Sequence, residues 1–305
     1  MKREVAAGSS VAVLSAFVWS TYYIFLHMLG TLSYFSVFLY PSLVGGILFL
    51  VYGAVKGGHF SLPSRKLDIV LPALGYLSSQ FMIIFSTEIN GGVITATFVL
   101  IGDAILSPAI IYSIGRNRFI PNFSLFFPGI AILVISSATL SLFGGQFGVH
   151  SLYGLLLVSI VPVLIAVFFV YTNERIMVDG MARILTPTFF ASSAIVILPA
   201  LLIHDPVALM IPNFSDMLIL FVIGATSMFA GYLLFFAASK LTGFTLTSIL
   251  MCMIPVFTLL LSVSLIGFSL TPVSVALVIG AVSGATMCTI AFGEGKKKDR
   301  SLASR

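Results

Sequence analysis

The chain has 305 residues, of which 59% are hydrophobic and 8% are charged. A soluble domain carries about 25% charged residues, so this chain has too little charge to cover a water-facing surface of its size. The mean hydropathy of +1.16 therefore excludes a soluble protein and indicates an all-α polytopic membrane protein. The net charge of +5 is not clustered on a soluble face, which excludes a nucleic-acid partner.

Apolar windows of about 19 residues predict ten membrane-spanning helices joined by short connections. The first apolar stretch is too long for a cleaved signal peptide and is read as the first helix. The expected spans are 5–28, 33–53, 68–87, 92–114, 123–143, 152–172, 185–203, 217–239, 245–267 and 272–292.

The positive-inside rule orients these spans in the membrane. With the N-terminus in the cytoplasm, all 15 Lys and Arg residues fall in cytoplasmic segments. Both termini are then cytoplasmic, including the basic tail Gly295–Arg305. We expect a multi-pass protein of the plasma (cell inner) membrane.

Ten helices divide into two sets of five, and an odd number per set gives the second set an inverted topology. We expect a first repeat at residues 1–148 and a second repeat, with the basic tail, at residues 149–305. A shift of helices 3 and 4 onto helices 8 and 9 superposes similar residues. The pairs are Gly91 with Gly243, Thr95 with Thr247, Gly115 with Gly267 and Asp103 with Pro255.

Asp103 is the charged side chain nearest the centre of an apolar span, in the stretch Gly92–Ile114. Insertion scales put a charge there at about 2.5–3.5 kcal/mol unfavourable. Ser107 lies on the same helix face at i+4 spacing. Asp103 can bind a cationic group of a substrate, carry a coupling proton, or hydrogen-bond a neighbouring helix for packing.

Other polar or aromatic residues at membrane depth are candidates for the wall of a shared cavity, because polar tips in lipid need partners. Each of them can also be an interhelical packing residue. Prolines inside the spans can produce broken or simply kinked helices. The candidate substrate-binding residues are Asp103, Gln80, Trp19, Tyr232, Tyr76, Tyr23, Ser248 and Ser107, and the candidate gating or kink residues are Pro108, Pro162 and Pro255.

The sequence also lacks several motifs. It has no GxxxxGK[ST] loop, so no nucleotide hydrolysis is expected. It has no His, Cys or Glu cluster with metal-ligand spacing, so we expect no metal and no cofactor. It has no convincing local set of nucleophile and base, so we do not expect an enzyme.

The pattern resembles the drug/metabolite transporter superfamily, in its ten-helix EamA-like branch. The resemblance rests on the five-plus-five architecture, on Trp19 with Ser20 in helix 1, and on the stretch Ser248–Pro272 with its Pro-Val-Phe sequence. Phe268 follows Gly267 where the family often has Glu, which leaves the substrate subclass open. The resemblance implies a secondary transporter with a central cavity lined by helices 1, 3, 4, 6, 8 and 9.

We therefore expect a secondary transporter that moves a small organic solute by alternating access. An amino acid or related metabolite fits, in the direction of export, with proton coupling through Asp103. The alternatives are efflux of amines or hydrophobic cations, a non-coupled channel or receptor, and an intramembrane enzyme. The expected partners are the solute, the lipid bilayer and, in the coupled case, protons; a monomer is compatible with the sequence.

Overall fold

The computed structural model of the chain describes residues 2–29, 32–56, 62–63, 65–90, 106–113, 121–143, 152–203, 212–267 and 271–303. Within these ranges the chain forms helices and no strand, which confirms the prediction of an all-α chain. The helices are α1 (Lys2–Met28), α2 (Tyr34–Val55), α3 (Leu67–Asn90), α5 (Ser107–Ser113), α6 (Phe123–Phe143), α7 (Leu152–Asp179), α8 (Met181–Ile203), α9 (Phe214–Ile223), η2 (Gly224–Gly231), α10 (Tyr232–Thr242), α11 (Phe244–Leu250), η3 (Met251–Met253), α12 (Ile254–Ile266) and α13 (Pro272–Ala303).

Several of these helices are built to cross a membrane. In the described part of the chain, 7 helical segments have the length and the apolar composition needed to cross a membrane. Helices α6 and α8 carry shorter apolar stretches. The chain is therefore a polytopic membrane protein. Most of the predicted fourth span, including Asp103, lies outside the described residues, and only α5 represents it. The ten-helix count and the inverted repeat stay predictions.

Two predicted boundaries were wrong at the junction between α7 and α8. Helix α7 ends at Asp179 and not at residue 172, and α8 begins at Met181 and not at residue 185. The polar end of α7 stays helical because its side chains find partners on neighbouring helices, as Asn173 does on Ser239. Gly180 ends α7 with a φ of 89°, a conformation that favours glycine.

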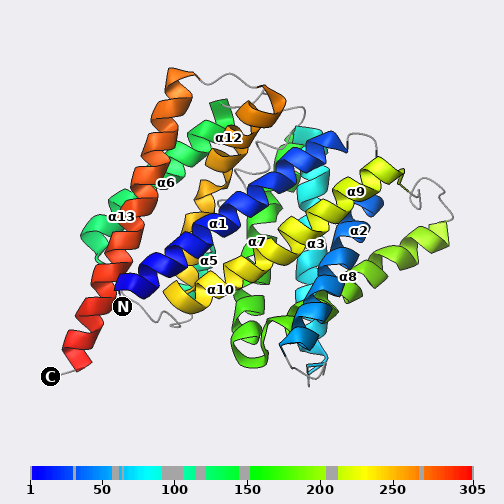
Figure 1. Ribbon diagram of the computed structural model, residues 1–305, viewed down its shortest axis with the longest axis horizontal. Helices are drawn as coiled ribbons and strands as arrows, with labels where there is room; N and C mark the ends of the chain where they lie inside the picture. The colour runs from blue at the N-terminus through cyan, green and yellow to red at the C-terminus, as the bar shows by residue number, and fades with distance from the viewer. Residues whose placement is uncertain are drawn as a thin grey trace.

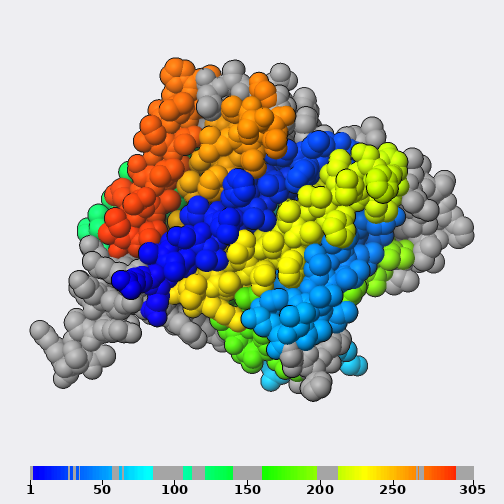
Figure 2. All heavy atoms as spheres, viewed as in Figure 1, coloured from blue at the N-terminus to red at the C-terminus, as the bar shows by residue number. Residues whose placement is uncertain are grey.

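Helices from the two halves of the chain alternate in space. Helix α1 packs against α10 and α12, α2 packs against α8 and η2, α3 packs against α7 and α8, and α6 packs against α13. Figure 1 shows the continuous segment α9–η2–α10 running between α1 and α2, and Figure 2 shows the same arrangement on the surface of this face. The first and second halves therefore share one interleaved interior.

Small residues bring the backbones of α6 and α13 close together, as expected where lipid gives no hydrophobic driving force between helices. A Cβ atom on Gly284 would lie 2.6 Å from the backbone nitrogen of Leu133 and 2.7 Å from the carbonyl oxygen of Gly129. Both neighbours are backbone atoms that cannot rotate away. A side chain at Gly284 therefore forces the two helices apart.

We expect Gly284→Val to lower the free energy of unfolding by about 1–3 kcal/mol through overpacking. The thermal midpoint of the purified protein in detergent measures the loss. Ser283→Val, at the exposed neighbouring position, is the matched control and should leave the midpoint nearly unchanged. Equal midpoints for both variants would contradict the close packing of α6 on α13.

Candidate functional site

A pocket lies where helices of both halves meet. Its cavity volume is about 50 Å³, and since one water needs about 10–15 Å³, it holds only a few water molecules in this conformation. Helices α1, α3, α7, η2, α10 and α12 supply its wall. The lining residues are Trp19, Tyr22, Tyr23, Ser79, Gln80, Ile83, Ile165, Phe169, Ser227, Met228, Tyr232 and Ile254.

Trp19 is anchored in this wall by a hydrogen bond and by three aromatic rings. Its Nε1 donates a hydrogen bond of 2.8 Å to the carbonyl oxygen of Ser227. Its ring stands edge-on to Tyr232 at a centroid distance of 5.2 Å and stacks on Phe235 at 5.6 Å. Phe169 contacts the same indole at 5.5 Å. One residue of the first half is thus held by aromatic and polar groups of the second half.

The segment η2 is a π-helix, a form that often marks functional sites. Its wider turn changes which backbone carbonyls are paired within the helix, and in lipid each free carbonyl needs another donor. Helix α1 supplies two such donors, since Trp19 donates to Ser227 and Ser15 donates from Oγ to the carbonyl oxygen of Gly231 at 2.9 Å. A Cβ on Gly231 would overlap the indole of Trp19, so this approach requires glycine.

The polar side chains of the pocket are uncharged. The carboxamide of Gln80 is half-buried and makes no hydrogen bond to any other described residue, which leaves its donors and its acceptor available. Ser79 uses its hydroxyl on the carbonyl oxygen of Tyr76 at 3.0 Å. The hydroxyl of Ser227 is buried and has no partner within the described ranges. Gln80 is therefore the polar group most available to a ligand.

Tyr76 does not line the pocket, although the sequence predicted it as a substrate contact. It is fully buried beside the pocket. Its hydroxyl lies 2.9 Å from Oγ of Ser42 and 3.0 Å from the sulfur of Met228. These partners satisfy the phenol, so Tyr76 supports Met228 from behind and is not offered to a solute.

The other predicted residues lie in different places. Trp19, Tyr23, Gln80 and Tyr232 are brought together at the pocket. Ser248 is fully buried, does not line it, and its hydroxyl has no partner among the described residues. Ser107 is buried at the start of α5. Asp103 lies outside the described residues.

The three prolines differ in their effect on the helices. Just before Pro255 the helix tightens into the 3₁₀ turn η3, between α11 and α12, while the chain stays helical throughout. At Pro162 the helix α7 continues without interruption. Pro108 is the second residue of α5, directly after the first residues that the structure describes in this part of the chain. Of these positions, Pro255 coincides with a change of helix type.

The sequence did not predict Ser227, Met228, Phe169 or Ile254 as pocket residues. Apolar periodicity marks such positions as interior without showing which of them face a cavity. The flanking glycines Gly224 and Gly231 were the one available signal, because glycine allows close backbone approach. In the described part of the chain, no group of three or more His, Cys, Asp or Glu side chains could hold a metal ion.

Comparisons with known proteins agree with this architecture. Residues 152–290 match the model of the EamA-like transporter family. One solved crystal structure superposes with a TM-score of 0.77 over 94% of this chain and 98% of its own, at 16% sequence identity, which supports the fold alone. No curated protein matches the chain. The family match and the apolar helices support a membrane transporter of the drug/metabolite type.

We expect Gly231→Ala to displace the indole of Trp19 and to lower the free energy of unfolding by about 1–3 kcal/mol. Trp19 is the single tryptophan of the chain, so its fluorescence emission should shift as its hydrogen bond is lost. Ala230→Gly, at the preceding position, adds no atoms and is the control. Wild-type emission and stability in Gly231→Ala would contradict the contact.

Proposed function

We propose that this membrane transporter, whose residues 152–290 match the model of the EamA-like transporter family, moves a small organic solute through the pocket between its halves. The solute is an amino acid or a related metabolite, and the direction is export across the plasma membrane. The chain acts as a secondary transporter by alternating access, and ten helices in two inverted repeats form its architecture. Both termini are then cytoplasmic.

The position of the pocket is the observation that carries this proposal. Trp19 and Gln80 come from helices of the first half, and Phe169 and Tyr232 come from helices of the second half. A rigid rocking of one half against the other changes the pocket wall at once and can expose it to either side in turn. A site inside a single half would not respond to such a motion.

The chemistry of the wall suits an amphipathic solute. Five aromatic side chains line the pocket, and the described lining carries no charged group; the rings are those of Trp19, Tyr22, Tyr23, Phe169 and Tyr232. The rings take an apolar or aromatic body, while the carboxamide of Gln80, which bonds to no other described residue, can both donate and accept hydrogen bonds to a polar head. Asp103 is the residue that we assign to a charged ammonium or a coupling proton.

A second candidate function follows from the same aromatic faces. Aromatic rings attract a cation within about 6 Å of the ring centroid, and quaternary ammonium ligands are recognised in this way. The uncharged described lining gives no cationic group that would repel such a solute. Efflux of amines or hydrophobic cations is therefore the alternative substrate class.

Trp19 offers a direct readout of solute binding, because it is the single tryptophan and lies in the pocket wall. We expect a transported amino acid to change its emission in a saturable titration. Gln80→Ala should weaken the apparent affinity about fivefold, as expected for the loss of about one hydrogen bond. Trimethylated amines, titrated in parallel, test the alternative substrate class.

Thr226→Ala is the control for that titration, since its hydroxyl bonds its own helix at Val222 and does not line the pocket. It should bind like the wild type. If solutes that the protein transports in proteoliposomes leave Trp19 emission unchanged, the pocket is not the binding site.

Asp103→Asn separates the roles assigned to that carboxyl group. If Asp103 carries the coupling proton, the variant should lose transport driven by a pH gradient and keep solute counterflow, because exchange moves no net proton. If it pairs with a substrate ammonium, counterflow should fall as well. Normal affinity and normal pH dependence in the folded variant would remove Asp103 from the mechanism.

A further inference from the structure

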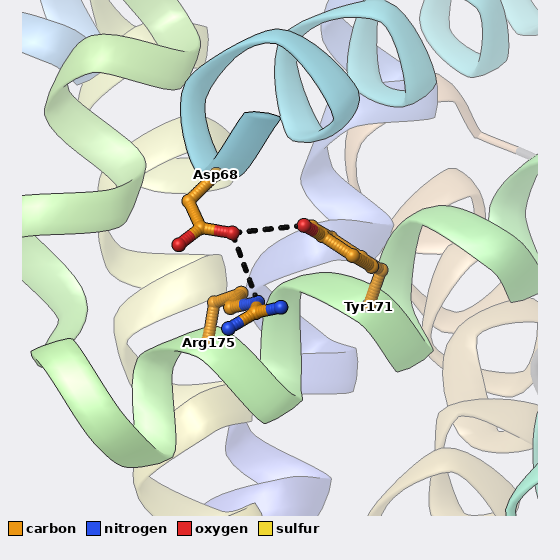
Figure 3. A network of polar contacts seen from close by, with 3 residues as sticks. All are labelled: Asp68, Tyr171 and Arg175. Atoms are coloured by element: carbon orange, nitrogen blue, oxygen red, sulfur yellow. Dashed lines mark hydrogen bonds and ion pairs between the residues drawn. The ribbon is translucent and has the colours of Figure 1, made fainter. Parts of the chain in front are cut away.

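A charged cluster joins the two halves at one end of the molecule. Asp68 lies in the first turn of α3, and Tyr171 and Arg175 lie near the end of α7 (Figure 3). The hydroxyl of Tyr171 donates a hydrogen bond of 2.9 Å to Oδ1 of Asp68. Nε of Arg175 lies 3.0 Å from the same oxygen and forms an ion pair with it. We call these three residues the α3–α7 cluster.

The geometry of the cluster makes its parts depend on one another. Tyr171 and Arg175 are one helical turn apart, and the guanidinium carbon lies 5.2 Å from the centroid of the tyrosine ring. The ring therefore supports the cation while its hydroxyl holds the anion. The side chain of Asp68 is only 5% exposed, so loss of either partner leaves a poorly solvated charge. This contact is unlike an exposed surface ion pair, which contributes little.

The cluster lies on the same two helices that line the pocket. Along α3, Gln80 follows Asp68 by twelve residues, which is about 18 Å of helix. Along α7, Phe169 precedes Arg175 by six residues, which is about 9 Å. A motion that separates α3 from α7 at the cluster therefore also changes the wall of the pocket.

Buried rings fill the space beside α3 and α7 at the level between the pocket and the cluster. Tyr76 lies 5.9 Å from Phe168 and 4.8 Å from Phe189, measured between ring centroids. Phe168 in turn contacts Tyr232 of the pocket wall at 6.1 Å. All of these rings are buried. In this conformation, packed rings lie against the pocket wall, and the cluster lies farther along α3 and α7 toward this end.

A second polar contact near the end of α7 lies within the second half. Oγ of Ser239 on α10 donates to Oδ1 of Asn173 at 2.7 Å, and both residues belong to the second half. The ion pair of Asp68 with Arg175, by contrast, links the first half to the second. Helices α7 and α10 can thus move together while the contact to α3 breaks.

We propose that the α3–α7 cluster is a latch that holds the transporter closed at this end. The latch must open before solute can pass between the pocket and the side of the membrane at which the cluster lies. Lys56 ends α2 and Arg65 and Lys66 precede α3 at this same end, which by the positive-inside rule is the cytoplasmic end. The role of the latch in transport rests on the proposed function, whereas the opening of the latch rests on the cluster alone.

The test places a cysteine behind the latch in a background of Cys252→Ala and Cys288→Ala. Thr172 is fully buried, next to Tyr171 on α7, and Thr172→Cys changes its size little. A membrane-impermeant thiol reagent is applied separately to each face of sealed vesicles. We expect Asp68→Asn to raise the labelling rate about tenfold or more from the basic face, because it removes the buried charge pair.

Asp179→Asn is the matched control. It breaks the exposed pair of Asp179 with Arg183, where the atoms are 3.9 Å apart and the side chains are 21% and 40% exposed. This variant should label at the wild-type rate. Tyr171→Phe removes a single hydroxyl and replaces Asp68→Asn as the test variant if Asp68→Asn does not fold. Tyr171→Phe should raise the labelling rate by a smaller factor. Asp68→Glu, which keeps the charge, should restore slow labelling.

The outcomes separate the latch from the transport function. Slow labelling in both Asp68→Asn and Tyr171→Phe, or equal acceleration in Asp179→Asn, overturns the latch. Fast labelling together with altered solute exchange in proteoliposomes supports both proposals. Fast labelling in a protein whose wild type exchanges no solute supports the latch and overturns the proposed function.

Discussion

The interior of this protein is governed by the need to satisfy polar groups where lipid offers no partner. The contact between Trp19 and the carbonyl oxygen of Ser227 meets that need at the centre of the molecule. It depends on Gly231, which leaves room for the indole, and on the π-helical turn that presents the carbonyl. Without this contact, α1 would keep only the hydrogen bond of Ser15 to η2, and the indole would lose its polar anchor in the pocket wall.

Two layers of contact extend from that centre along α3 and α7. The first is a packed set of aromatic rings around Tyr76, and the second is the charged cluster of Asp68 with Arg175. The rings hold the helices together without directional bonds, whereas the cluster holds them through an ion pair and a hydrogen bond. A directional contact of this kind between the halves can favour one of two discrete arrangements of the helices.

The sequence predicted the helical class and many of the elements because ~20-residue apolar runs are strong signals. It also predicted that Trp19, Gln80 and Tyr232 face a shared space, since polar and amphipathic tips in a span require partners. It did not predict η2, because a π-turn arises from packing against α1 and leaves no periodic signature. Asp68 was missed as well, since an acid in the first turn of a helix is normally read as a solvated residue.

Asp103 was the leading functional residue in the sequence, and its role stays a proposal. What the described residues add is a site with aromatic walls and one free carboxamide, closed toward the basic end. A charged group contributed by Asp103 would complete such a site for a zwitterionic or cationic solute. We thus assign solute recognition to the pocket wall and the control of access to the α3–α7 cluster.

The central claim is that α3 and α7 separate and rejoin as solute passes. The most direct measurement is the distance between spin labels at Lys66→Cys and Met177→Cys, two exposed positions near the cluster, in the background without Cys252 and Cys288. We predict two distance populations in membranes, with a transported solute shifting their ratio. A single distance that no transported solute changes would contradict the account.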